Sequence, residues 1–170
     1  MNGHYTYLLI NFCTVVFPLA LSFDKRVRFF KSWRYLLPGI LITGLFFLAW
    51  DVVFTLNGVW SFNQDKIIGL YFFHLPLEEV LFFLTVPFAC IFIYACLNYY
   101  VKWQLAQMVV NITSALLIIA CLAALFIFWG RLYTMVTFGV LFLLICLAHY
   151  ILKVNWLSRF YGAYLVVLIP

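Results

Sequence analysis

The sequence predicts an all-α fold, a polytopic bundle of about six transmembrane helices, and two observations carry this prediction. Of the 170 residues, 68% are apolar and only 9% are charged, whereas soluble domains carry about 25% charged residues. The apolar residues also gather in runs that approach or reach the roughly 20 residues needed to cross a bilayer. The alternating segments of a membrane β-barrel are missing, so helices that satisfy their own backbone hydrogen bonds are expected.

Six apolar runs divide the chain. Five of them predict helices near residues 5–23, 35–55, 77–97, 107–129 and 132–152, and a sixth run begins near Phe160. The sixth run is too short to cross a bilayer before Pro170, so we expect residues 1–170 to be one transmembrane domain whose C-terminal part is missing. The basic turn before Phe160 loosely echoes the turn that ends at Arg34 and Tyr35, which predicts a parallel internal repeat.

The basic residues predict an orientation in the membrane. The loop after the first run contains Lys25, Arg26, Arg28, Lys31 and Arg34. If this loop is cytoplasmic, Lys102, Lys153 and Arg159 lie on the same side, and only Lys66 and Arg131 lie outside, as the positive-inside rule favours. We therefore expect a multi-pass protein of the inner (cytoplasmic) membrane with its N-terminus outside.

Other kinds of partner are disfavoured. The net charge of +5 comes from short loops rather than from a basic stripe with base-stacking residues, so no nucleic acid is expected. The five cysteines are scattered through apolar runs, with no C-x-x-C pair and no clustered histidines. We therefore expect no metal site, and the lipid bilayer is the expected surrounding.

Three acidic residues lie at the ends of apolar runs, where a charged group costs free energy, and they form the candidate site. Asp51 closes an apolar run and either faces a cavity or ends its helix at the membrane interface. Glu78 and Glu79 follow Pro76, the expected first helical residue, where acidic residues also stabilise an ordinary helix start. In an apolar site we expect burial and like-charge repulsion to leave one of these two glutamates protonated near neutral pH.

A protonated acid of this kind suits the protonation of an apolar alkene. Water would quench the resulting carbocation, so aromatic rings must stabilise it through cation–π attraction. Aromatic residues make up 22% of the chain. The sequence therefore contains enough rings for such a site.

An ordered set of motifs carries a resemblance to a known family. The set consists of Trp50-Asp51, the segment Asn57 to Asn63, Gly69, the segment Leu75 to Glu79, and Phe82-Phe83. It resembles the membrane-embedded, flavin-independent lycopene cyclases, the heterodimer-derived type of bacteria, archaea and fungal fusion proteins. The likeness covers about positions 5 to 100 well and the rest of the chain only in hydropathy.

The resemblance implies that the linear ends of lycopene or related linear carotenoids are cyclised to β-rings without a cofactor. A proton adds to the terminal double bond, the cation closes a six-membered ring, and a base removes a ring proton. The resemblance implies Glu78 or Glu79 as the acid, and Asp51 as cation stabiliser or base. The residues expected to bind substrate are Asn63, His74, Trp60 and Phe82.

The family also carries a second acidic motif that this chain lacks. A C-terminal part that is missing here or a second subunit is expected to supply this motif. The partners left open are therefore a second subunit and, independently of the motif, a homo-oligomer.

Two other functions fit the same residues. A carotenoid end-group hydratase would capture the same cation with water, and a non-catalytic carotenoid- or lipid-binding membrane subunit would use the pocket without needing both glutamates. A prenyltransferase would need aspartate-rich motifs for magnesium, and a retinal-binding receptor would need a lysine in mid-helix. The sequence has neither feature.

The predicted orientation can be tested with a cysteine at position 57 in a chain whose five native cysteines are replaced. We expect Asn57→Cys to react with a membrane-impermeant maleimide added to intact cells, because the loop at Asn57 lies opposite the basic loop. A control, Lys25→Cys, should react only after the membrane is opened. Labelling of position 57 only from the cytoplasm would contradict the orientation.

Overall fold

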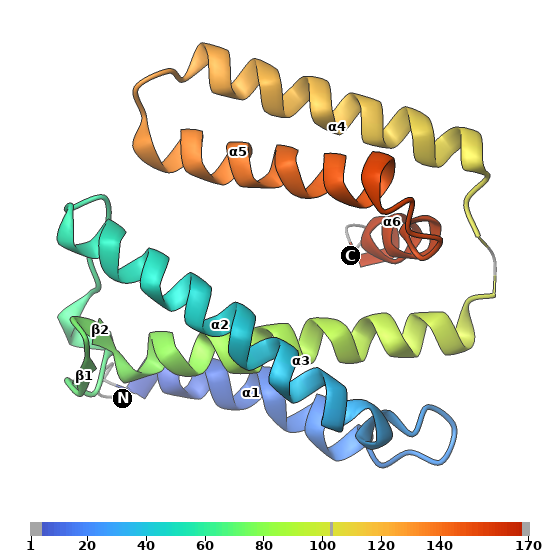
Figure 1. Ribbon diagram of the computed structural model, residues 1–170. Coiled ribbons are helices and arrows are strands. Elements are labelled where there is room, and N and C mark those ends of the chain that lie inside the picture. Colours follow the sequence, from blue (N-terminus) through green and yellow to red (C-terminus); the bar gives the residue numbers. More distant parts are fainter. Residues whose placement is uncertain (1–4, 103, 168–170) are drawn as a thin grey trace. The chain divides into compact units, whose positions relative to one another are not determined.

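The computed structural model describes residues 5–102 and 104–167, and this part of the chain forms six helices with little other regular structure. It divides into two compact units, Met1–Tyr100 and Val101–Pro170. Figure 1 shows helices α1 to α3 in the first unit and α4 to α6 in the second. The prediction of an all-α fold is confirmed.

The first unit is built around α3 (Leu77–Tyr100), which packs against both α1 (Thr6–Leu21) and α2 (Trp33–Leu56). A 3-10 turn, η2 (Phe29–Ser32), leads into α2, and a second one, η3 (Gln64–Lys66), lies in the connection between α2 and α3. The same connection ends in an antiparallel hairpin of two short strands, β1 (Tyr71–Phe72) and β2 (Leu75–Pro76).

The second unit consists of α4 (Gln107–Ile127), α5 (Leu132–Cys146) and α6 (Leu157–Val167). A π-helical turn, η4 (Leu147–Ile151), continues α5. Figure 1 shows α4 and α5 running alongside each other in opposite directions. The start of α4 and the end of α5 therefore lie at the same end of this helix pair.

Four helical stretches of the described chain are long and apolar enough to cross a membrane: Phe29–Leu56, Leu77–Tyr100, Gln107–Ile127 and Leu132–Ile151. Helix α1 is also apolar but has only 16 residues. All of the expected helices are present within a few residues of their expected ends, because polar loops separate the apolar runs.

The loop after α1 folds back against the bundle. Phe29 is buried and meets Phe88 and Phe92 edge to face, with ring centroids 5.5 and 5.4 Å apart. Ile40 completes the buried part of this cluster. Aromatic packing thus fixes the basic loop to α2 and α3.

A buried amide joins α1 to α3. The Asn11 side chain is 5% exposed, and its Nδ2 donates to the backbone oxygens of Glu78 (3.0 Å) and Tyr7 (3.1 Å). Its Oδ1 accepts the hydroxyl of Thr85 at 2.6 Å. A polar group without a partner is costly in apolar surroundings, so these bonds fix the position of α1 along α3 at the level of Glu78.

We expect Asn11→Leu to lower the free energy of unfolding by about 1–3 kcal/mol, because the Thr85 hydroxyl and the Glu78 carbonyl both lose a partner. Thermal unfolding of the purified protein in detergent measures this change. The matched control is Thr14→Val on the same helix, since the only described hydrogen bond of the Thr14 hydroxyl goes to the backbone oxygen of Ile10. A loss no greater than that of the control would contradict a bridging role for Asn11.

Candidate functional site

The structure brings the three candidate acids together where the end of α2 meets the start of α3. Asp51 lies in the last two turns of α2, and Glu78 and Glu79 lie in the first turn of α3. The side chains of Asp51 and Glu78 are 3% and 2% exposed, and Glu79 is half-buried. Asp51 and Glu79 are close enough for the charge of one to act on the other.

Glu78 is held at both its backbone and its side chain. Its Oε1 accepts the backbone N–H of Ile68 at 2.7 Å, and its backbone oxygen accepts the Asn11 amide. Its Oε2 is buried and has no hydrogen-bond partner among the described residues. Glu78 therefore ties the loop between α2 and α3 to the first turn of α3 and to α1.

Asp51 lies beside an indole group. The Trp60 side chain interacts with the Asp51 carboxyl group, and its Nε1 also donates to Thr55 Oγ1 at 3.2 Å. The Asp51 Oδ2 is buried and, within the described chain, has no hydrogen-bond partner. Because an unpartnered buried oxygen is costly in an apolar site, a proton or a bound molecule would stabilise this carboxyl group.

A series of rings, here called the aromatic ladder, runs past Asp51. Its members are Phe83, Phe47, Trp50, Phe54 and Trp60, whose successive ring centroids lie 6.3, 6.0, 5.4 and 5.2 Å apart. Phe47 and Phe54 lie about one helical turn before and after Asp51, on the same face of α2. The ladder therefore places aromatic rings on both sides of a carboxyl group.

The hairpin before α3 fixes where that helix begins. Its two-residue turn, Phe73-His74, has positive φ angles of 47° and 70°, which side chains adopt reluctantly in such turns. The Leu77 N–H donates to the Leu70 oxygen at 2.8 Å, and the buried Leu75 anchors the second strand. The glutamates at the start of α3 are thus presented by a tightly constrained segment.

The residues expected to bind substrate occupy different places. Trp60 belongs to the aromatic ladder, and the half-exposed Phe82 meets Phe83 at its end, with ring centroids 6.0 Å apart. His74 lies in the exposed hairpin turn. Asn63 is exposed, and its side chain accepts the backbone N–H of Asp65 at 2.9 Å, capping η3. Substrate binding by these four residues stays a prediction.

Two features of the site are not predicted from the sequence. One is the role of Asn11. A lone amide in an apolar run costs free energy unless it is hydrogen-bonded, as a lone carboxyl group such as that of Asp51 does, and this could have indicated it. The roles of Phe47 and Phe54 were also missed, because the many aromatic residues of this chain give no sequence signal for which rings will stack. Only the spacing of Phe47 and Phe54 around Asp51 could have indicated them.

Two apolar hollows lie beside α3 in the first unit. One, of about 490 Å³, is lined by Asn11 together with apolar residues of α1 and α3, including Phe12 and Leu81. The other, of about 360 Å³, lies among α1, α2 and α3, and Val15 and Thr85 line both. These surfaces suit contact with hydrocarbon chains rather than with polar ligands.

Comparison with known proteins connects this geometry to a family. A family model described as lycopene cyclase matches residues 4–97 and 130–170. The first matched segment contains the three acids and the whole aromatic ladder. No curated protein and no solved structure matches the chain. The family match covers most of the sequence, and the chain therefore belongs to the lycopene cyclase family.

Proposed function

We propose that this protein closes β-rings at the linear ends of lycopene by acid catalysis, with no net oxidation or reduction. Membership of the family supports carotenoid cyclisation in general. The observation that carries the finer proposal is the pairing of Glu79 with Asp51 beside the aromatic ladder. This arrangement combines a proton source with rings that can face a carbocation.

Glu79 is the proposed proton donor. Two neighbouring carboxyl groups hold one proton more easily than two negative charges, and Glu79 and Asp51 are such neighbours. Glu79 is only half-buried, so its side chain has access to a substrate and to a source of new protons. One oxygen of the Glu78 carboxyl group, Oε1, already accepts the Ile68 N–H, which suits a positioning role.

The aromatic ladder and Asp51 are proposed to stabilise the cation that forms. Ring faces attract a positive charge without offering it an oxygen that would form a bond. The Asp51 carboxylate, once Glu79 has given up its proton, supplies a negative charge near the same rings. Asp51 is also proposed to accept the ring proton that ends the reaction. Transfer of this proton from Asp51 to the neighbouring Glu79 would then restore the starting protonation of the pair.

The assignment is tested by expressing carboxyl variants in bacteria that accumulate lycopene and separating the pigments. We expect Glu79→Gln to lower cyclisation about 100-fold, since an amide cannot donate the proton. Glu78→Gln should lose less, because an amide oxygen still accepts the Ile68 N–H. Glu78→Ala should lower cyclisation more than Glu78→Gln, because it leaves the Ile68 N–H without an acceptor.

The control for these variants is Asp65→Asn, which removes an exposed carboxylate in the same connection. Protein levels and lycopene binding are measured in parallel, so that low expression can be distinguished from a loss of catalytic activity. Full activity of Glu79→Gln would overturn the assignment of the acid. Hydroxylated rather than ringed end groups from the unmodified protein would indicate capture of the cation by water, and unchanged lycopene would count against catalysis.

The ladder gives a second prediction. We expect Trp50→Leu to slow cyclisation about tenfold while lycopene binding persists, because a leucine of similar hydrophobicity offers the cation no ring face. Trp50→Phe keeps a ring and should stay closer to the unmodified rate. Phe17→Leu, at an exposed position of α1 outside the ladder, is the matched control. Equal rates for Trp50→Leu and Trp50→Phe would contradict cation stabilisation by this ring.

A further inference from the structure

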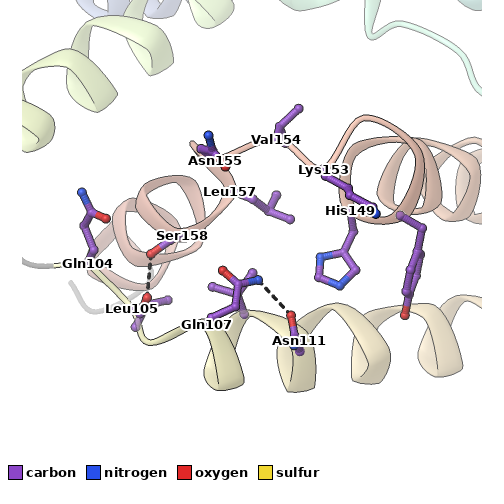
Figure 2. Close-up of a pocket in the computed structure, with 12 residues that line it drawn as sticks. Gln104, Leu105, Gln107, Asn111, His149, Lys153, Val154, Asn155, Leu157 and Ser158 are labelled. Carbon is purple, nitrogen blue, oxygen red and sulfur yellow. Dashed lines mark hydrogen bonds between the residues drawn. The ribbon is translucent and has the colours of Figure 1, made fainter.

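The second unit contains a polar cavity of about 730 Å³. It lies between the start of α4 and the turn that follows α5, at one end of this helix pair. Figure 2 shows His149 reaching toward α4, where Gln107 and Asn111 line the opposite wall. Lys153 and Asn155 contribute from the segment between η4 and α6.

The walls of this cavity are held in place by packing and hydrogen bonds. The Ser158 hydroxyl donates to the Leu105 backbone oxygen at 2.8 Å, which joins α6 to the segment before α4. Leu157 and Tyr161 pack against the buried Val110 of α4. The cavity therefore exists before any ligand arrives, and a ligand need not order it.

The cavity is basic, and its unit has no acidic residue to balance it. Residues 101–170 contain Lys102, Arg131, Lys153 and Arg159 but no aspartate or glutamate. Lys153 lines the cavity. Arg159 is next to Gln104, another lining residue, whose amide with its oxygen turned toward Arg159 accepts two hydrogen bonds from the guanidinium group, 2.8 and 3.0 Å long. A cavity with this charge attracts an anion.

Several groups that line the cavity are hydrogen-bond donors. The buried Ser114 hydroxyl contacts Tyr161 Oη at 2.9 Å and His149 Nδ1 at 3.4 Å. If Tyr161 donates to Ser114 and Ser114 to Nδ1, the hydrogen of the imidazole is on Nε2 and can be donated to a ligand. Asn111 Oδ1 accepts from Gln107 at 3.0 Å, so the Asn111 amide N–H groups are also available as donors.

We propose that this cavity binds the phosphate group of an anionic phospholipid. An ammonium group with imidazole and amide donors matches the oxygens of a phosphate. The cavity lies where apolar spans end, which is the level of lipid head groups. Exposed apolar side chains beside Lys153, those of Ile151, Leu152 and Trp156, are placed to contact the rest of the lipid.

The test measures which lipid stays bound when the full-length protein is extracted from bilayers with equal amounts of phosphatidylglycerol and phosphatidylcholine. We expect retained phosphatidylglycerol to exceed phosphatidylcholine. Lys153→Asn should weaken phosphatidylglycerol binding about fivefold, as expected for one basic group at the membrane surface. Asparagine is chosen because Lys153 has a positive φ of 47°, which asparagine tolerates.

Two further variants make the result specific. Lys153→Arg keeps the charge and should keep most of the binding. Arg131→Gln removes an equal charge at the other end of the α4–α5 pair and should change nothing, and melting temperatures show that each variant is folded. No preference for phosphatidylglycerol, or equal losses in Lys153→Asn and Arg131→Gln, would overturn the proposal. Release of the lipid by millimolar inorganic phosphate would overturn the lipid as the source of the phosphate group.

Discussion

The arrangement of the first unit depends on the hydrogen bonds that one buried acidic residue accepts. Glu78 lies at the start of a helix that can cross a membrane, where an unpartnered polar group is costly. Its backbone oxygen takes the Asn11 amide from α1, and its carboxyl group takes the Ile68 N–H from the connection after α2. A single residue thus fixes the position of α1, the connection and α3, and the neighbouring Glu79 is positioned by the same contacts.

Much of this organisation could be predicted from the sequence. Long apolar runs predict the helices with their approximate ends, because membrane spans leave a strong local signal. Asp51, Glu78 and Glu79 could be singled out for a similar reason, since charge is rare and expensive beside such runs. Chain order alone does not bring these residues together, because α2 and α3 are joined by a long connection, residues 57–76, which contains η3 and the hairpin.

The remaining features depend on contacts that no local sequence pattern indicates. Nothing local in the sequence indicates that Ile68 donates to Glu78, or that Phe83 stacks on Phe47. The sequence also does not indicate which of Glu78 and Glu79 is buried. Adjacent residues on a helix point about 100° apart, and only the packing decides which side chain faces inward. The cavity of the second unit was missed because its polar residues are separated by about forty positions and form no motif.

Basic residues are nearly absent from the part of the chain that forms the site. Between Tyr35 and Val101 the sequence has only one lysine or arginine, Lys66, and it lies in the exposed turn η3. A basic side chain inside this part of the bundle would pair with the acids and would repel a cation formed beside them. In the proposed reaction, a carboxyl group without a basic neighbour gives up a proton, and the aromatic rings stabilise the positive charge that results. The other basic residues lie in loops or near helix ends, and one of them, Lys153, lines the cavity of the second unit, for which an anionic partner is proposed.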